Sequence, residues 1–189
     1  MFQPSAPPAS LGADLRALRR SRGITLQTLA ARLGRSVGWI SQVERDLSHP
    51  SIDDLRAFAG AFDVPLSIFF GQCATRAGED GRVVRAGARR RIGAEGAALV
   101  EELLSPDLTD EFEMVHSTFQ PGASLPAPQQ RPTTEVGYIV SGRLDMTIGG
   151  QDFTLDPGDS FRIKGEPFRW ANPYDRPAVA IWVIAPPVY

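Results

Sequence analysis

The sequence predicts a chain of two parts, an all-α segment followed by an all-β barrel or sandwich. Residues 13–70 carry apolar side chains at helical spacing. Beyond residue 82, short apolar runs alternate with turn signals such as Gly149-Gly150 and Asn172-Pro173, a pattern typical of all-β folds. Between the two parts, residues 71–81 (GQCATRAGEDG) are small and polar, which indicates a linker.

The α-segment divides into five predicted helices. Apolar stripes define the first four of them: Leu15 and Leu18; Leu26, Leu29, Ala30 and Leu33; Ile40 and Val43; Ile52, Leu55, Phe58, Ala59 and Phe62. A fifth helix is predicted over Leu66–Phe70, with Pro65 in its first turn. Residues suited to capping stand between the stripes: Gly23, Thr25, Gly34, Ser36 and Ser51, the last in an S-x-x-D box with Asp54.

The β-segment contains apolar runs of strand length. Examples are Tyr138–Val140, Leu144–Ile148, Phe153–Leu155 and Val179–Ile184. Turn signals such as Asp156-Pro157-Gly158-Asp159 separate them. Strands and turns at this spacing predict a sandwich or a small barrel.

Composition narrows the class of protein. A hydrophobic content of 42% and a charged content of 22% over 189 residues are ordinary for a soluble protein. No apolar run approaches the roughly 20 residues of a membrane helix, and residues 1–10 resemble a disordered, proline-rich tail rather than a secretion signal. The single cysteine, Cys73, excludes an internal disulfide framework. We therefore expect a cytoplasmic protein without a membrane partner.

The net charge of −2 conceals an asymmetry between the two parts. From Gly12 to Pro50 there are seven arginines against three acidic residues, a net charge of +4. From Gly71 to the end there are 12 basic and 16 acidic residues, a net charge of −4. This split predicts a polyanionic partner for the first part only.

The stretch LQTLAARLGRSVGWISQVERDLSHPS predicts two short helices joined by a turn at Gly34-Arg35. The second helix buries Ile40 and Val43, which leaves a polar and small face outward. Gln42 on that face can make two hydrogen bonds to adenine, and arginines beside it can neutralise phosphates. The predicted DNA-binding residues are Arg32, Arg35, Ser36, Val37, Gly38, Ser41, Gln42 and Arg45.

This stretch resembles the helix-turn-helix domain of phage-repressor-like (XRE-type) regulators, on the elements LRALRRSRGITL, LAARLG, SVGWISQVER and HPSIDDLRAFAGAF. The resemblance covers residues 11–70. It implies a five-helix domain with Ser36–Glu44 as the recognition helix in the major groove, and a pair between Arg19 and Glu44. The alternative for the whole unit is a helical protein-interaction domain, and the alternative for Trp39 is packing rather than DNA contact.

A second stretch, PGASLPAPQQRPTTEVGYIVSG, has the glycine and glutamate spacing of a metal-binding strand motif. Together with LDPGDSFRIKGEPFRWANP it resembles the two motifs of the cupins, small β-barrels (double-stranded β-helices), and the resemblance covers residues 82–189. Cupins usually place histidines at the positions of Pro128, Gln130 and Phe168, with Glu135 as a further ligand. Because Pro128 and Phe168 offer no donor, we expect no metal, no cofactor and no catalytic residue here.

What remains is a barrel that can enclose a small molecule. The predicted effector pocket consists of His116, Gln130, Glu135, Phe168, Trp170 and Trp182. A carboxylate beside aromatic rings suits an amine or a similar cation. In the alternative interpretation Glu135 pairs with Arg131 or Arg169, the aromatic residues are barrel core, and His116 is an ordinary strand residue.

Joined together, the halves resemble regulators in which a repressor-like DNA-binding domain precedes a cupin sensor. The resulting hypothesis is a ligand-responsive transcriptional regulator, not an enzyme, that binds a double-stranded DNA operator as a homodimer, because two readers reach major grooves about 34 Å apart. Its effector is unknown. Two rival hypotheses are a cupin isomerase or dioxygenase with an accessory DNA domain, and an adaptor whose helical domain binds protein.

Overall fold

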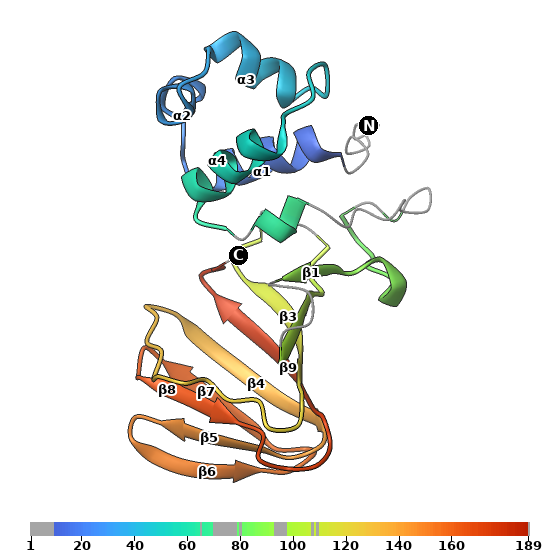
Figure 1. Ribbon diagram of the computed structural model, residues 1–189, viewed down its shortest axis with the longest axis vertical. Coiled ribbons are helices and arrows are strands. Elements are labelled where there is room, and N and C mark those ends of the chain that lie inside the picture. The colour runs from blue at the N-terminus through green and yellow to red at the C-terminus, as the bar shows by residue number, and fades with distance from the viewer. Residues whose placement is uncertain are drawn as a thin grey trace, which may run out of the picture. The chain divides into compact units, whose positions relative to one another are not determined.

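The computed structural model describes residues 10–64, 66–69, 79, 81–92, 98–106, 108 and 110–188. The chain forms two compact units (Figure 1): the first runs to Arg90 and includes Pro106–Asp110, and the second consists of Arg91–Ser105 and Glu111–Val188. The predicted tail (apart from Ser10), Pro65, Phe70, Cys73 and all of the predicted linker except Glu79 and Gly81 lie outside the described residues. The predicted domain boundaries therefore stay predictions.

The first unit is helical, as predicted. Its elements are α1 (Leu11–Ser21), α2 (Leu26–Leu33), α3 (Val37–Val43), α4 (Ile52–Phe62), and the short 3₁₀ helices η1 (Leu66–Phe69) and η2 (Ala86–Ala88). The prediction of a fifth α-helix is wrong in type, because residues 66–69 form one 3₁₀ turn. Four residues are too few to build a ladder of α-helical hydrogen bonds, and 3₁₀ geometry is common in such short connectors.

The helix ends of this unit follow from the predicted caps. The hydroxyls of Thr25, Ser36 and Ser51 each accept a hydrogen bond from the backbone N–H three residues later. Ser51 and Asp54 complete a capping box. Gly34 ends α2 with a φ of 61°, a left-handed conformation that glycine adopts at little cost.

The core of the helical unit is built from the predicted apolar stripes. Leu15, Leu29, Ile40 and Phe58 are fully buried at its centre. Trp39 stacks on Phe58 with ring centroids 6.2 Å apart. This contact favours the packing interpretation of Trp39.

The second unit is built from antiparallel strands in two sheets. Its strands are β1 (Arg90–Ile92), β2 (Leu99–Leu103), β3 (Glu113–Phe119), β4 (Thr134–Ser141), β5 (Leu144–Ile148), β6 (Gln151–Leu155), β7 (Ser160–Lys164), β8 (Phe168–Ala171) and β9 (Ala178–Ala185). One sheet has the order β1-β2-β3-β9-β4-β7 and the other the order β6-β5-β8 (Figure 1). This is the predicted cupin architecture.

Two glycine positions explain how the chain turns between these strands. Gly149 and Gly150, with φ of 57° and 82°, join β5 to β6, because a two-residue hairpin turn of this kind needs positive φ at both positions. At Gly142, with φ of 74°, an added Cβ would lie 2.3 Å from the carbonyl oxygen of Pro177. Only glycine fits this close approach of two backbones.

Strand alternation gives the six-stranded sheet two distinct faces. Glu135, Gly137 and Ile139 of β4 point into the unit, whereas Val136, Tyr138 and Val140 point outward. The neighbouring strands follow the same alternation, since each residue shares a face with its registered partners. Among the described residues, no helix has the length and apolarity needed to cross a membrane.

Candidate nucleic-acid interface and candidate effector site

The candidate recognition helix α3 follows α2 after a turn of three residues. Gly34 ends α2, and Ser36 accepts a hydrogen bond from the backbone N–H of Trp39 at 3.1 Å. Ile40 and Val43 are buried, with exposed fractions of 0% and 1%. These contacts fix one side of α3 against the core.

The opposite side of α3 carries the predicted base-reading residues. Val37, Gly38 and Gln42 are exposed and Ser41 is half-buried. A Cβ added at Gly38 would have no neighbour within 4 Å. Gly38 lies one helical turn before Gln42 and therefore leaves room on this side for a base edge to approach.

The predicted phosphate-binding arginines differ in their surroundings. The Nε of Arg45 donates to the carbonyl of Ser41 at 3.1 Å, and an Nη of Arg32 donates to the carbonyl of Ala61 at 3.3 Å. Both side chains belong to exposed residues, so both can present charge to a backbone of phosphates.

Arg35 is engaged within the helical unit. Its Nη2 lies 2.6 Å from Oδ1 of Asp54 and its guanidinium lies 5.0 Å from the ring of Trp39. Burial raises the pKa of Asp54, but the hydrogen bonds from Ser51 and Arg35 outweigh it and hold that pKa below its ordinary value. Arg35 thereby ties the turn before α3 to the start of α4.

A second ion pair ties α1 to the end of α3, as the resemblance implies. Nε and Nη2 of Arg19 donate to the two oxygens of Glu44 at 2.6 and 2.9 Å. Nη1 of Arg19 also donates to the carbonyl of Ile24. Hydrogen bonding to Glu44 raises the pKa of Arg19. This planar, two-pronged pairing holds the C-terminal end of α3 in a fixed orientation relative to α1.

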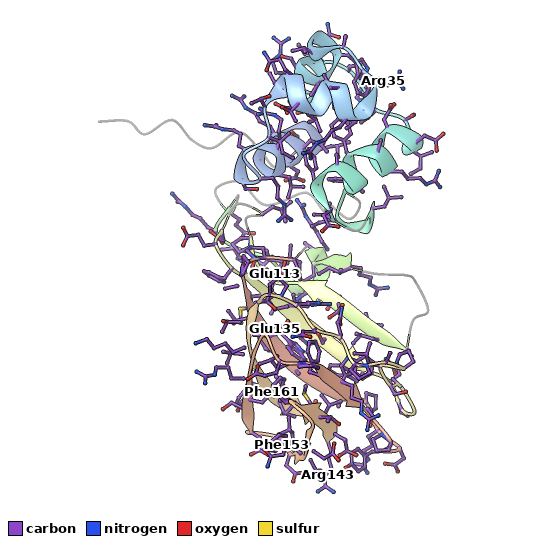
Figure 2. The ribbon with its side chains drawn as sticks, turned by 90° about the vertical axis from the view of Figure 1, so that its left-hand side faces the viewer. Arg35, Glu113, Glu135, Arg143, Phe153 and Phe161 are labelled. Carbon is purple, nitrogen blue, oxygen red and sulfur yellow. The ribbon has the colours of Figure 1, made fainter. Side chains whose placement is uncertain are left out.

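In the cupin unit, the motif residues are arranged in a way that does not suit a metal. Glu135 is buried in β4 and accepts a hydrogen bond from the hydroxyl of Thr133 at 2.7 Å (Figure 2). Gln130 is exposed, and its amide donates to the carbonyl of Gly165 at 2.8 Å. Among the described residues, no group of three or more His, Cys, Asp and Glu is arranged to hold an ion. The donors present therefore do not fit a cupin metal.

Aromatic rings fill the inward side of the barrel. Phe161 meets Trp182 edge to face at 4.8 Å, and Phe168 lies 6.4 Å from the same indole. Trp170 meets Phe119 edge to face at 4.7 Å. Phe168, Trp170 and Trp182 are all buried. This arrangement favours the interpretation of these aromatic residues as barrel core.

His116 lies on the other side of the sheet from these rings. Val115 and Ser117 of β3 are buried, so the intervening His116 points outward, beside Glu102 at 3.9 Å. This direction does not match the predicted place of His116 in a pocket inside the barrel. The alternative for Glu135 is an ion pair with Arg131 or Arg169; in the structure Thr133 donates to Glu135, and Arg169 donates to Thr147.

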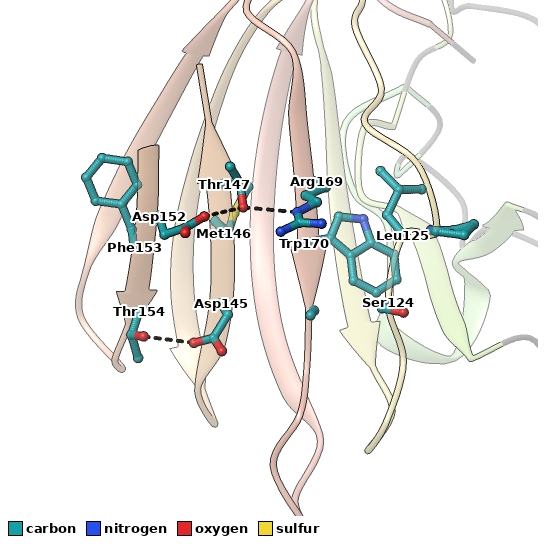
Figure 3. Close-up of a pocket in the computed structure, with 12 residues that line it drawn as sticks. Ser124, Leu125, Asp145, Met146, Thr147, Asp152, Phe153, Thr154, Arg169 and Trp170 are labelled. Carbon is teal, nitrogen blue, oxygen red and sulfur yellow. Dashed lines mark hydrogen bonds between the residues drawn. The ribbon is translucent and has the colours of Figure 1, made fainter. Parts of the chain in front are cut away.

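A cavity of about 540 Å³ lies along the three-stranded sheet and the loop at Ser124–Pro126, and we call it the β5 groove (Figure 3). Of the six residues predicted for the effector pocket, only Trp170 lines it. The Nε of Arg169 donates to Thr147 at 3.2 Å, and Thr147 donates to Asp152 at 2.6 Å. The remaining lining residues are Ser124, Leu125, Pro126, Asp145, Met146, Phe153, Thr154 and Ala171.

Asp145 forms a second polar cluster in the β5 groove. It accepts hydrogen bonds from the hydroxyls of Thr154 at 2.9 Å and Tyr174 at 2.8 Å. Burial, together with the hydrogen bond to Asp145, raises the pKa of Tyr174. The sequence carries a signal for this site: Asp145 and Thr147 alternate with buried Leu144 and Met146, which marks one polar face of a strand.

Two family models match the chain. The model described as a helix-turn-helix domain matches residues 10–67, and the model described as a cupin domain matches residues 115–184. The fold and the exposed face of α3 thus define the class, a DNA-binding regulator with a cupin domain.

Similar proteins of known class support the same assignment. The HTH-type transcriptional regulator PuuR of Escherichia coli (strain K12) is 26% identical over 163 residues, which cover 85% of this chain and 86% of PuuR. The HTH-type transcriptional regulator SutR of the same organism is 28% identical over 159 residues, covering 82% of this chain and 83% of SutR. The transcriptional regulator ClgR of Mycobacterium tuberculosis (strain ATCC 25618 / H37Rv) is 32% identical over 97 residues, covering 51% of this chain and 87% of ClgR. This chain belongs to the XRE-type helix-turn-helix transcriptional regulators, and in it the DNA-binding domain is followed by a cupin domain, as the resemblance implies.

Proposed function

We propose that this regulator binds a specific operator in the cytoplasm by inserting α3 into the major groove, and that a small molecule bound by the cupin unit alters that binding. The observation that carries the first part is the split of α3 into a buried side, with Ile40 and Val43, and an exposed side, with Val37, Gly38 and Gln42. A recognition helix needs both: a side fixed to its domain and a side free to meet base edges.

Each side chain at the interface has a proposed role. Gln42 reads a base, with Val37 and Ser41 beside it, and Ser36 and Gly38 allow close approach at the start of the helix. Arg32 and Arg45 contact phosphates. Arg35 is assigned to holding the α2–α3 turn, because Asp54 and Trp39 already engage its guanidinium.

The regulator is proposed to act as a homodimer. One helical unit is large enough for one half-site, and repressor-like proteins place two readers about 34 Å apart, one turn of DNA. A dimer therefore reads a two-fold symmetric operator.

The test is selection of bound duplexes from a random DNA library with the full chain. The expected result is one enriched, two-fold symmetric sequence whose half-site centres are about 10 base pairs apart, with affinity falling steeply as salt rises. Recovery of DNA without any enriched sequence would contradict sequence-specific reading. Absence of DNA binding at low salt would favour the adaptor hypothesis.

For the second part, we propose that the effector binds in the β5 groove. Its volume of about 540 Å³ lies in the range of small-molecule sites. Two carboxylates, Asp145 and Asp152, and one guanidinium, Arg169, line it together with Trp170. A small polar molecule that carries an ammonium group complements this surface.

The effector test measures thermal stabilisation of the protein by a panel of small amines, amino acids and sugar acids. A compound that stabilises the wild type should lose its effect in Asp152→Asn and in Arg169→Ala. The matched control is Asp53→Asn, an exposed carboxylate of α4. Loss of the effect in Glu135→Gln instead would move the site to the barrel interior, and stoichiometric iron or manganese in the purified protein would favour the enzyme hypothesis.

A further inference from the structure

Two side chains of opposite charge lie on neighbouring strands of the β5 groove. In the strand register, Asp145 of β5 lies opposite Ala171 of β8, and Thr147 lies opposite Arg169. Asp145 and Arg169 are therefore diagonal neighbours on one side of the sheet, with Cα atoms about 7–8 Å apart, and both line the cavity (Figure 3). In the described part of the chain, neither of them has a partner of opposite charge.

The carboxylate of Asp145 keeps one oxygen available. Both of its hydrogen bonds end on Oδ1, and both come from neutral hydroxyls, those of Thr154 and Tyr174. Oδ2 has no partner among the described residues. The guanidinium of Arg143 lies 5.4 Å from the ring of Tyr174, but it is paired with Asp156 at 2.7 Å. A half-buried carboxylate with a free oxygen and no cationic partner favours a positively charged ligand.

The guanidinium of Arg169 keeps two nitrogens available. Its Nε donates to the hydroxyl of Thr147, which in turn donates to Asp152. This bond fixes the direction of the guanidinium, and within the described residues its two Nη nitrogens have no acceptor. Two parallel N–H groups on one planar guanidinium match the two oxygens of a carboxylate. The groove therefore offers a carboxylate-binding group diagonally beside an ammonium-binding group.

The wall of the groove beyond β8 is apolar. Opposite Asp145, Ala171 carries only a methyl group, which leaves space between the carboxylate and the loop at Ser124–Pro126. That loop is held against β8, because the backbone N–H of Leu125 donates to the carbonyl of Trp170 at 2.9 Å. Leu125 and Pro126 both line the cavity. An aliphatic group that lies against them is removed from water, which favours binding.

We propose that the β5 groove binds a free amino acid with an aliphatic side chain, with its ammonium group on Oδ2 of Asp145 and its carboxylate on the Nη nitrogens of Arg169. This inference rests on the proposed function in one respect, the placement of the effector in this groove. The aliphatic side chain lies along Leu125 and Pro126. A ligand with only an ammonium group leaves Arg169 without a charged partner, and a ligand with only a carboxylate leaves Asp145 without one. Only a zwitterion forms charge-assisted hydrogen bonds to both groups.

The experiment measures dissociation constants for the full chain by isothermal titration calorimetry, with three probes that share one carbon skeleton. The probes are L-leucine, isopentylamine, which lacks the carboxylate, and isocaproate, which lacks the ammonium group. L-Leucine should bind at least about 10-fold more tightly than either of the others, because each of them loses a hydrogen-bonded contact to a charged group. Equal affinities for the three probes, or no binding of L-leucine, would overturn the proposal.

Two variants test which end of the ligand each group binds. Asp145→Asn should weaken L-leucine binding at least about 10-fold and leave the affinity for isocaproate unchanged. Arg169→Gln should weaken L-leucine binding to a similar degree and leave the affinity for isopentylamine unchanged. A variant that merely misfolds would lose all three probes, so this crossed pattern separates recognition from folding. The matched controls are Asp53→Asn and Arg162→Gln, which make the same changes at exposed residues outside the groove and should keep all three dissociation constants.

Failure of this inference is distinguishable from failure of the proposed function. If isopentylamine binds as tightly as L-leucine and loses affinity in Asp145→Asn, the groove remains the effector site and the zwitterion proposal fails. If L-leucine binds with unchanged affinity in both variants, it occupies another site, and the placement of the effector in the groove fails as well. With the duplex enriched in the library selection, L-leucine should change the affinity of the wild type for DNA by about 5- to 150-fold. Binding of L-leucine in the groove without such a change supports the site and contradicts its role in regulation.

Discussion

The guanidinium of Arg19 and the carboxylate of Glu44 form a two-pronged ion pair with N···O distances of 2.6 and 2.9 Å. The pair joins α1 to the C-terminal end of α3 through two residues that are 25 positions apart in sequence. Both side chains are nearly buried, with exposed fractions of 12% and 5%. The orientation of α3 therefore depends in part on a contact that lies outside its exposed side, which carries Val37, Gly38 and Gln42.

Glu44→Ala should strongly destabilise the helical unit. Removing one partner leaves the other charge buried without compensation, which costs about 3–5 kcal/mol in comparable cases. Urea unfolding followed by circular dichroism at the helical wavelength measures the loss. The control is Arg56→Ala, which breaks an exposed pair with Asp53 and should cost no more than about 1 kcal/mol. Equal losses in the two variants would contradict a structural role for the Arg19–Glu44 pair.

The helical half was largely predictable because its signals are local. Thr25, Ser36 and Ser51 each cap the helix that follows within three residues, so their role needs no knowledge of distant contacts. The buried and exposed sides of α3 follow from the spacing of Ile40 and Val43. What spacing does not reveal is that Arg35 pairs with Asp54, 19 residues away. Nothing local distinguishes that arginine from one that contacts phosphate.

The barrel was predictable as a fold and less so as a site. The turn glycines and strand periods are local, but which side chain fills the centre depends on the register of distant strands. Gly137, Phe161 and Trp182 meet because β4 lies between β7 and β9. His116 illustrates the same point, since a shift of one position in β3 decides whether a side chain enters the barrel.

Gly137→Ala should destabilise the cupin unit. An added Cβ would lie 2.1 Å from Cζ of Phe161, and that ring has little room to move because it packs on Trp182. Overpacking of this kind costs about 1–3 kcal/mol, measurable in thermal or denaturant unfolding of the strand signal. Phe161→Leu in the same chain should recover part of the loss, giving a coupling of about 0.5–3 kcal/mol in a double-mutant cycle.

A glycine-to-alanine substitution should instead raise stability at a position where the added Cβ has no close neighbour. Gly60 lies in α4, and an added Cβ would meet nothing within 4 Å. Gly60→Ala should therefore stabilise the helical unit by up to about 1 kcal/mol, through helix propensity. A destabilising Gly60→Ala, or a neutral Gly137→Ala, would contradict the packing described here.

Acid should weaken the helical unit through Asp54. Its pKa is lowered in the folded state, because the hydrogen bonds from Ser51 and Arg35 outweigh the opposing effect of burial. Because the pKa is lowered, the stabilisation that Asp54 contributes is complete above its pKa in the unfolded chain, about 3.9. That stabilisation is lost as the pH falls through the pKa of Asp54 in the folded protein. Helical stability of the wild type should fall below about pH 4, and that of Asp54→Asn should fall less. Asp53→Asn, at an 84% exposed side chain, should behave like the wild type.

Gln42→Ala and Arg45→Ala should weaken DNA binding in different ways. Gln42 lies on the exposed side of α3, and a two-bond contact with adenine is worth about 1–3 kcal/mol of discrimination. Its removal should lower affinity for the selected duplex and equalise the affinities for all four bases at one position of each half-site.

Arg45 is exposed, so its removal should weaken binding to every sequence alike. It should also reduce the slope of log affinity against log salt by about one per lost phosphate contact. Arg35→Ala cannot serve here, because it also breaks the pair with Asp54. Fluorescence anisotropy with the selected duplex and its single-base variants, at three salt concentrations, separates the two effects. An unchanged base preference in Gln42→Ala would remove Gln42 from the reading surface.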